Sequence, residues 1–434
     1  MAEINLKDLN SRRILVKDIF KTKAKEVEVV GWIHNSRDLS KIRFILLRDM
    51  SGVIQVTGVR GKTSDNVFKE MGSIPRESVI YVKGSVKDSK QALGGKEINP
   101  EEIKIISKAE DLPIDVSDFS KTELPKRLDY RFLDLHRKRT QAIFKIQSEI
   151  ANSFRRYFYD KEFMEVQLPS IISSSSEGGT DLFTVNYFEK KAYLAQSPQL
   201  YKQMLACSVE KVFTITPVWR AEKHNTVRHL NESRQMDIEL AFAGQKEIMK
   251  ELEGVVKYIV KEVLDKCKEE LALLGVKLKV PKTKYLSYDE TAKFLKMKYG
   301  EDLSPEDEKK LNEKFPDTIV FVYSWPTKLK PFYIMPKDEK VDAKLSEGFD
   351  AIYKGLEISS GGQRIHIPDL LEKKLKSKGL NPKNFKSYVD SFRYGAPPHA
   401  GWSIGLERLT QLITGQANIR EAVLFPRDRD RLSP

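Results

Sequence analysis

The segment TPVWRAEKHNTVRHLNESRQMDIEL, residues 216–240, contains two strand-like runs separated by a long polar loop. This pattern predicts an antiparallel hairpin. Its functional side chains lie near the loop and along the returning strand: Arg220, Glu222, Arg228, His229, Asp237 and Glu239. Guanidinium groups bind phosphate through paired hydrogen bonds, so such a hairpin could hold a triphosphate. Taken alone, the same residues would also suit a solvated hairpin with surface ion pairs.

A second segment, FDAIYKGLEISSGGQRIH at 349–366, combines acidic, hydroxyl and glycine residues. Asp350 and Glu357 flank a predicted strand, and Ser360 follows. Carboxylates together with a hydroxyl suit Mg²⁺, which prefers oxygen ligands and nucleotide phosphates. The glycine pair at 361–362 allows either a close approach of the backbone to a ligand or a plain turn.

A third segment, YGAPPHAGWSIGLERL at 394–409, reads as a strand followed by a helix. Gly401 and Gly405 leave one face of the strand open, and Glu407 and Arg408 begin the helix. An arginine at that place could stack on a base and neutralise phosphate. The three segments together indicate a nucleotide site more strongly than any of them alone.

Composition narrows the class of protein. The 434 residues suggest two or three domains. The formal net charge of +13 fits either a nucleic-acid partner or the Lys/Glu-rich surface of a heat-adapted protein. Cys207 and Cys267 have no metal-ligand spacing, so we expect reduced thiols. Because no signal-type or membrane-spanning apolar run occurs, we expect a soluble cytoplasmic protein without membrane association.

The N-terminal part has the pattern of a small β-barrel. Five short segments with period-two alternation lie between 25 and 107, separated by Gly, Asp and Ser. They are too close together for crossover helices, which favours an OB-like fold over 1–107. Residues 108–135 contain two prolines and little periodicity, so we interpret them as a hinge.

The remainder, 136–434, is predicted to be one domain with both helices and strands. Apolar residues recur at helical spacing from near Thr140, and longer helices are expected at about 244–272 and 369–391. Few of the strand-like runs are separated by helices of crossover length. We therefore expect an α+β chain in which a mostly antiparallel sheet is flanked by helices.

These segments resemble the class II aminoacyl-tRNA synthetases. FRRYFYDKEFMEVQLPSII, 154–172, looks like the first motif of that family, which lies at the usual dimer interface. WRAE with the following RH and MDIEL is similar to the second motif, and GWSIGLER to the third. Ser403 stands where the family usually has glycine, and Trp219 replaces a usual phenylalanine. The resemblance covers nearly the whole chain.

Within the family, a barrel, a hinge and a catalytic domain in this order resemble the subgroup for aspartate, asparagine and lysine. QSPQLYKQ, 196–203, is similar to the aspartyl enzymes, and so is SEGGTDLF, 176–183, which resembles a mobile loop over the substrate. The spacing between the second motif and FDAIYKGLE leaves no room for the extra domain of bacterial relatives. The form resembled is therefore the archaeal or eukaryotic one, and we expect the archaeal form because the sequence shows no N-terminal extension.

The resemblance implies an aspartate–tRNA ligase that forms aspartyl-adenylate from ATP. It places Lys202 and Arg364 on the side-chain carboxylate of aspartate, with Asp237 supporting both cations. For the substrate ammonium it implies Glu177, Ser197 and Gln199. Two cations near a desolvated anion would reject the amide of asparagine, because donors would then face donors.

For ATP, the resemblance implies electrostatic catalysis without a side-chain nucleophile. Arg220 and Arg408 would be the catalytic cations. The residues implied at the nucleotide are Arg220, Glu222, Arg228, His229, Glu357 and Arg408. Mg²⁺ would be the cofactor, held by Glu357, Ser360 and Asp350.

The barrel is implied to read the tRNA anticodon. Phe44 would stack on an unpaired base, while Arg37 and Gln55 would read base edges. His34 stands where strict archaeal relatives tend to carry tryptophan, which favours a relaxed enzyme that charges tRNA-Asn besides tRNA-Asp. A homodimer is also implied.

Three alternatives compete with this interpretation. An asparaginyl enzyme is disfavoured by QSPQLYK, and a tRNA-independent asparagine synthetase is disfavoured because such paralogues lack the barrel. A single-strand-binding protein built on the barrel leaves the three motifs of the larger part unexplained.

Overall fold

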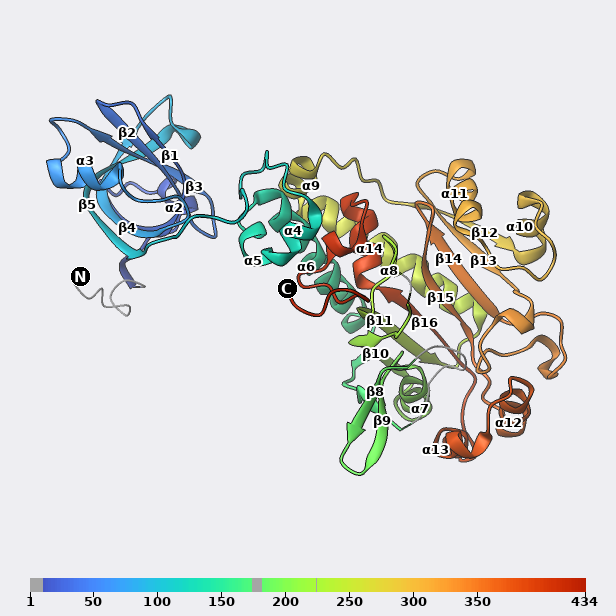
Figure 1. Cartoon of the computed structure of the whole chain (residues 1–434). Coiled ribbons are helices and arrows are strands. Elements are labelled where there is room, and N and C mark those ends of the chain that lie inside the picture. The colour runs from blue at the N-terminus through green and yellow to red at the C-terminus, as the bar shows by residue number, and fades with distance from the viewer. Residues whose placement is uncertain (1–10, 174–181, 224) are drawn as a thin grey trace. The chain divides into compact units, whose positions relative to one another are not determined.

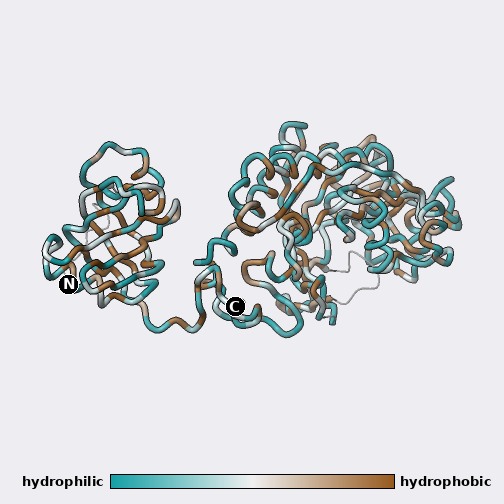
Figure 2. Tube along the Cα trace, turned by 90° about the horizontal axis from the view of Figure 1, so that it is seen from above, coloured by the Kyte–Doolittle hydropathy of each residue, from teal (hydrophilic) through white to brown (hydrophobic). Residues whose placement is uncertain are grey.

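The structure is a computed structural model that describes residues 11–173, 182–223 and 225–434. Contacts within the chain divide it into two units, Met1–Pro113 and Ile114–Pro434. Apolar segments follow the strands and inner helices of each unit, and hydrophilic segments lie mainly in the outer loops and helices (Figure 2). Every helix in the described ranges is too short or too polar to cross a lipid bilayer.

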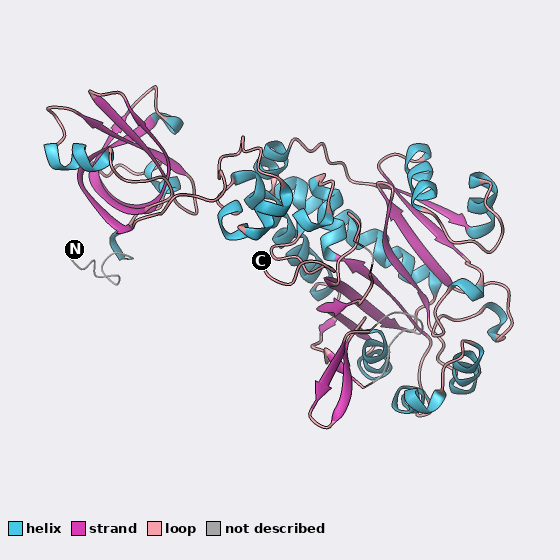
Figure 3. Ribbon diagram, in the orientation of Figure 1, coloured by secondary structure: helices cyan, strands magenta, loops and turns pink. Residues whose placement is uncertain are grey.

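The first unit is a closed five-stranded barrel with the strand order β1-β2-β3-β5-β4 (Figure 3). Its side chains alternate between the interior and the outside, so Val27, Val29 and Ile33 enter the barrel core. The predicted OB-like fold is confirmed. The elements are α2 (Val16–Ile19), β1 (Glu26–Asp38), β2 (Ile42–Arg48), β3 (Val53–Val59), α3 (Asp65–Met71), β4 (Val79–Asp88) and β5 (Lys96–Ser107).

Much of the segment predicted as a hinge packs with the second unit. Residues from Ile114 on belong to that unit and include α4 (Leu124–Asp129) and α5 (Arg131–Asp134). The guanidinium of Arg131 is fully buried, lies 2.6 Å from Asp134 and donates to the carbonyls of Glu421, Val423 and Leu424. A buried ion pair of this kind fixes the segment, although its prolines and charges resemble those of a linker.

The second unit is built on an eight-stranded sheet in the order β12-β13-β14-β15-β16-β11-β10-β6 (Figure 1). All neighbours pair antiparallel except β6 with β10 and β12 with β13, so the predicted antiparallel α+β architecture is confirmed. A small sheet, β7-β9-β8, adjoins it in the chain. The strands are β6 (Met164–Glu165), β7 (Ile171–Ile172), β8 (Thr184–Tyr187), β9 (Lys190–Leu194), β10 (Lys211–Trp219), β11 (Glu232–Ala241), β12 (Lys282–Ser287), β13 (Thr318–Tyr323), β14 (Gly348–Tyr353), β15 (Leu356–Gln363) and β16 (His399–Gly405).

Three helices cover one face of this sheet: α6 (Lys138–Tyr159), α8 (Gln245–Lys266) and α14 (Leu406–Thr414) (Figure 1). Their apolar stripes form the main core with inward side chains of the strands, among them Met236 and Ile238. The indole nitrogen of Trp402 donates to the carbonyl of Ile248 at 3.1 Å and so joins β16 to α8. Because neighbouring residues of a strand face opposite sides, Gln235 and Asp237 point to the other face.

The two long helices predicted at 244–272 and 369–391 are each interrupted. The first breaks at Cys267, where α9 (Lys268–Leu274) begins. The second divides into α12 (Pro368–Ser377), the 3₁₀ turn η4 (Pro382–Phe385) and α13 (Lys386–Phe392). The interruption of the second helix has a local cause, because Gly379 has a φ of 73° and Pro382 lacks a backbone donor. The other α-helices in the described ranges are α7 (Gln199–Val209), α10 (Tyr288–Leu295) and α11 (Pro305–Lys314).

Candidate functional site

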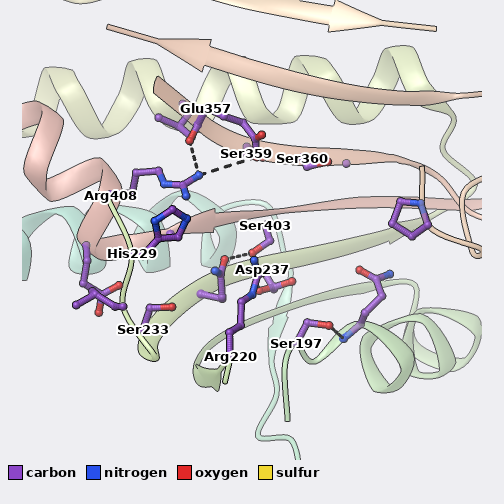
Figure 4. Close-up of a pocket in the computed structure, with 18 of the residues that line it drawn as sticks. Ser197, Arg220, His229, Ser233, Asp237, Glu357, Ser359, Ser360, Ser403 and Arg408 are labelled. Carbon is purple, nitrogen blue, oxygen red and sulfur yellow. Dashed lines mark hydrogen bonds and ion pairs between the residues drawn. The ribbon is translucent and has the colours of Figure 1, made fainter. Parts of the chain in front are cut away.

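A cavity of about 390 Å³ opens on the face of the sheet that α6 and α8 leave free (Figure 4). Strands β11, β15 and β16, the loop after β10 and the start of α14 supply much of its wall. It brings together most of the predicted substrate residues: Ser197, Gln199, Arg220, Glu222, Arg228, His229, Asp237, Glu357, Ser360, Arg364 and Arg408. Its other polar lining residues include Ser233, Gln235, Ser403 and Glu407. Glu177 lies outside the described residues.

The predicted hairpin is present as β10 and β11, and Arg220 follows directly after β10. The backbone nitrogen of Arg220 donates to the carbonyl of Asn231 at 2.9 Å. The side chain of Asn231 donates back to the carbonyls of Arg220 and Glu222. Within the described ranges, no carboxylate lies within 4.0 Å of the Arg220 guanidinium, which is therefore available to an anionic ligand.

The hairpin loop is tied to α11 through Arg228, and His229 is held by a contact within the loop. Arg228 pairs with Glu308 of α11 at 3.1 Å. The Nδ1 atom of His229 lies 2.6 Å from the hydroxyl of Thr226. Burial raises the pKa of Glu308, although the charge of Arg228 acts against this rise. These contacts hold the Arg228 guanidinium and the His229 ring at the edge of the cavity.

Glu357 and Ser360 place two oxygen donors at the opposite wall of the cavity. The first turn of α14 positions Arg408, whose Nη1 donates to the carbonyl of Glu357 at 2.7 Å (Figure 4). Partial burial and the neighbouring carboxylate of Asp350 raise the pKa of Glu357 to about 7. A carboxylate and a hydroxyl beside a polyphosphate site are donors that Mg²⁺ accepts, so Glu357 and Ser360 fit the predicted ion.

Asp350 does not line the cavity, although it lies opposite Ser360 on the neighbouring strand. Its carboxylate pairs with the ammonium of Lys330 at 2.5 Å. No group of three or more His, Cys, Asp or Glu side chains with metal-binding geometry occurs in the described part of the chain. The partner Lys330 comes from a separate loop, which no local pattern around Asp350 indicates, and the role of Asp350 as a metal ligand stays a prediction.

Lys202 also departs from its predicted role in this structure. Its ammonium lies 2.7 Å from Asp237 and 3.5 Å from Glu239, and it donates to the carbonyls of Ile238 and Trp402. The side chain is 1% exposed and does not line the cavity. The ammonium is thus already neutralised by protein groups, whereas we expected it to await the carboxylate of the substrate.

Arg364 reaches the cavity, but its support differs from the prediction. Its Nε and Nη2 donate to the two carboxylate oxygens of Glu239 at 2.9 and 3.3 Å. Asp237 therefore supports only Lys202, and Glu239 supports both cations. Despite burial, Arg364 and Lys202 lower the pKa of Glu239, while burial raises the pKa of Asp237. The sequence analysis did not predict this supporting role for Glu239. A signal was present, because Asp237 and Glu239 are two residues apart on one strand and so face the same side of the sheet.

Two positions of the third motif, Ser403 and Gly401, have a structural account. The Ser403 hydroxyl donates to Asp237 at 3.0 Å and also bonds to Gln235, so it joins the polar lining of the cavity. Gly401 lies opposite Glu239, and a Cβ atom there would lie only 2.0 Å from a carboxylate oxygen of that residue. Position 401 therefore requires glycine, and position 403 admits serine.

The barrel has a separate hollow of about 690 Å³ on its surface. Arg37 and Phe44 are paired across β1 and β2, and both line the hollow together with Gln55. The amide of Gln55 donates to Glu97 at 2.8 Å. His34 does not line this hollow, because its Nδ1 faces Glu77 at 3.9 Å. Three of the four predicted base-reading residues are thus brought together.

Comparisons with known proteins agree with this geometry. Residues 123–429 match the family described as tRNA synthetases class II (D, K and N), and residues 27–106 match the OB-fold nucleic acid binding domain. The chain belongs to the class II tRNA synthetase family.

Similar curated proteins identify the branch of the family. The chain is 47% identical to the aspartate–tRNA(Asp/Asn) ligase of Methanocaldococcus jannaschii, over 94% of this chain and 95% of that protein. It is 46% identical to the protein of the same name from Archaeoglobus fulgidus, over 94% and 97% of the two chains.

Solved structures of two specificities are similar as well. Asparaginyl-tRNA synthetase from Pyrococcus horikoshii, complexed with asparaginyl-adenylate, matches with a TM-score of 0.92 and 31% identity, covering 97% of this chain and 99% of that one. Aspartyl-tRNA synthetase from Entamoeba histolytica matches with a TM-score of 0.88 and 29% identity, covering 100% and 95%. The fold alone therefore does not separate aspartate from asparagine.

Proposed function

We propose that the chain is an aspartate–tRNA ligase. It activates L-aspartate with ATP to aspartyl-adenylate and transfers the amino acid to the 3′ end of tRNA-Asp, and also to tRNA-Asn. The observation that carries this proposal is the single cavity in which Arg364 lies with Arg220 and Arg408. One cation serves the amino acid and two serve the nucleotide. The names of the most similar curated proteins support the same assignment.

Selectivity for aspartate follows from the amino-acid end of the cavity. Arg364 uses Nε and Nη2 for Glu239, and among the described residues no hydrogen bond engages its Nη1, which can donate to a side-chain carboxylate. Lys202 fixes Asp237 behind it, and Ser403 fixes the other oxygen of Asp237. An amide in place of the carboxylate would direct its NH₂ at these donors, which costs about 1–3 kcal/mol for each unpaired group. Ser197 and Gln199 lie within reach of the α-ammonium.

Activation joins two anions, the α-carboxylate of aspartate and the α-phosphate of ATP. Arg220, which has no carboxylate partner in the described ranges, stabilises the charge that develops on the phosphate. Arg408, Arg228 and His229 hold the other phosphates, and Glu222 reads the adenine. Mg²⁺ held by Glu357 and Ser360 would supply further neutralisation of phosphate charge. The reaction then depends on placement and electrostatics.

Pyrophosphate exchange into ATP tests the activation step. We expect exchange with aspartate and none above background with asparagine or lysine, and loss of the activity in Arg364→Gln. Arg364→Lys keeps the positive charge but not the paired contact with Glu239. Exchange retained in this variant would show that charge is sufficient, and exchange lost in it would show that the guanidinium geometry is required. Stronger exchange with asparagine would refute the assignment to aspartate. It would favour an asparaginyl-tRNA synthetase, which is the second candidate because the Pyrococcus horikoshii enzyme of that name has a similar structure.

The transfer step engages the barrel with the tRNA anticodon. Phe44 offers an aromatic face for a base, and Arg37 and Gln55 offer donors beside it. His34 lies next to Asn35, which lines the same hollow, so a larger residue there would alter access to the base. We expect wild-type protein to aminoacylate tRNA-Asp and tRNA-Asn, and His34→Trp to lose mainly tRNA-Asn. Equal charging of both by the variant would refute this role.

We further propose that the enzyme acts as a homodimer in the cytoplasm, where tRNA charging supports translation. Strand β6 is an edge of the large sheet, and apolar side chains around it remain exposed: Tyr159 by 52%, Met164 by 53% and Ile171 by 45%. Unpaired edges with apolar neighbours favour pairing with another chain. Analytical ultracentrifugation should give a dimer that Met164→Lys weakens. A monomeric wild type at micromolar concentration would contradict the proposal.

A further inference from the structure

The C-terminal tail, residues 427–431, lies against the hairpin loop between β10 and β11. The backbone nitrogen of Asn231 donates to the carbonyl of Arg427 at 2.9 Å, and the guanidinium of Arg429 donates to the carbonyl of Lys223 at 3.2 Å. The described residues of both segments lie outside helices and strands. The loop therefore depends for its position on contacts of this kind, because it has no regular backbone hydrogen bonding of its own.

Arg420 connects the loop and the tail. It lies in the 3₁₀ turn η5 (Ile419–Ala422) and is 9% exposed. Its Nε pairs with the carboxylate of Asp428 in the tail, its Nη2 donates to the side-chain oxygen of Asn225, and its Nη1 donates to the carbonyl of Thr226 at 3.1 Å. Despite partial burial, the hydrogen bond from Arg420 lowers the pKa of Asp428, so the pair is ionised at neutral pH. One planar guanidinium thus serves three acceptors from two segments.

Thr226 carries this connection to the cavity. Its hydroxyl lies 2.6 Å from Nδ1 of His229 and accepts a hydrogen bond from the backbone nitrogen of Arg228 at 3.2 Å. Both of these residues line the cavity, whereas Arg420 does not. None of these contacts involves Arg364, which serves the amino acid. Arg420 is therefore one residue removed from two side chains at the nucleotide end of the cavity.

We propose that Arg420 is a positioning residue for the outer phosphates of ATP. By fixing Thr226 against η5 and the tail, it holds Arg228 and His229 where they meet these phosphates. A loop without this contact would sample more conformations, and ATP would have to order it on binding. The inference rests on the proposed function, because the ligand concerned is the ATP that activates aspartate. AMP lacks the outer phosphates, so its binding should not depend on Arg420.

Calorimetric titration of the full-length protein with ATP and with AMP, in magnesium buffer without aspartate, tests this directly. Arg420→Met should bind ATP about tenfold more weakly than wild type, because binding must then immobilise two side chains, and its affinity for AMP should stay within about twofold. Arg420→Lys keeps a charge beside Asp428 but cannot serve three acceptors, so it should restore ATP affinity only in part. Arg393→Met removes an arginine that pairs with Glu372 of α12 and should leave both affinities unchanged.

Thr226→Val supplies a test that does not depend on the stability of Arg420→Met. Thr226 is exposed, and valine keeps its shape and its carbonyl but removes the hydroxyl that contacts His229. This variant should weaken ATP binding by about threefold or more and leave AMP binding unchanged. Wild-type ATP affinity in Thr226→Val, or in a folded Arg420→Met, would overturn the proposal. An equal loss for ATP and AMP would overturn it as well, because Arg420 would then support the site as a whole.

Failure of the proposed function is recognised separately, by pyrophosphate exchange with aspartate on the same preparations. A wild type that binds ATP more tightly than AMP but shows no exchange would refute the ligase activity and leave the ATP comparison of the variants valid. Exchange by the wild type, together with variants of Arg420 and Thr226 that bind ATP normally, would refute the role of Arg420 alone. A wild type that does not bind ATP would refute both.

Discussion

Replacing Lys202 by methionine is the most informative perturbation of this site. Methionine has a similar length and fills the same space, but it removes the ammonium that contacts Asp237 at 2.7 Å and Glu239 at 3.5 Å. Both carboxylates are buried, and only Arg364 would remain beside them. The variant therefore leaves two buried anions against one cation.

The size of the effect follows from the burial of the pair. Removing one partner of a buried ion pair destabilises a protein by roughly 3–5 kcal/mol. With an unfolding entropy of about 2.1 cal/mol/K per residue applied to Ile114–Pro434, this corresponds to a fall in Tm of about 4–7 °C. Aspartate-dependent exchange should be lost as well, because Asp237 would no longer be held in place.

The pH dependence of this loss has a definite sign. Burial already raises the pKa of Asp237, and removing Lys202 would raise it further. A carboxyl whose pKa is raised by folding favours the folded state when protonated, and that stability is lost as pH rises through the raised pKa. The destabilisation of Lys202→Met should therefore be smaller at pH 5 than at pH 8.

Calorimetry of wild type, Lys202→Met and the exposed-lysine control Lys246→Met at the two pH values checks this reasoning. The control should unfold within about 1 °C of wild type, as surface substitutions usually do. A Lys202→Met variant as stable as the control, or one whose loss of stability is the same at both pH values, would refute the electrostatic account.

Three further predictions concern other parts of the molecule. Arg220→Ala should reduce pyrophosphate exchange by about 10²–10³-fold. Its Tm should change little, because this guanidinium has no carboxylate partner in the described ranges. A fall in Tm similar to that of Lys202→Met would contradict the absence of such a partner. Phe44→Ala should raise the KM for tRNA by the equivalent of about 1–3 kcal/mol and leave pyrophosphate exchange unchanged. An equal loss in aminoacylation and in pyrophosphate exchange would rule out a role confined to tRNA. Burial raises the pKa of Glu407 to about 7, so its contribution to stability should fall as pH rises from 6 to 8. Glu407→Gln should flatten that part of the stability profile, and an unchanged slope would show that other groups cause it.

Local sequence patterns were sufficient for most of the fold. Period-two alternation located the barrel strands, and the stripe that begins near Thr140 located α6. The prediction was wrong where helix-breaking residues lie within a long apolar pattern, as Gly379 and Pro382 do within the predicted helix 369–391. Gly361 and Gly362 lie within β15 and do not form a turn. A Cβ atom on Gly361 would come within 2.6 Å of the carbonyl oxygen of Gly401, so the closeness of β16 explains that glycine.

The sequence by itself determined the family, the order of the two units and the residues that carry charge into the cavity, because motifs and alternation are properties of short segments. Only the tertiary structure decided which charges neutralise one another. Glu239 supports Arg364 from 125 positions away, and Lys330 covers Asp350 from 20 positions away. Such ion pairs form because the packing of distant elements brings the two charges together in the interior, where an unpaired charge costs free energy. A short stretch of sequence does not contain this information.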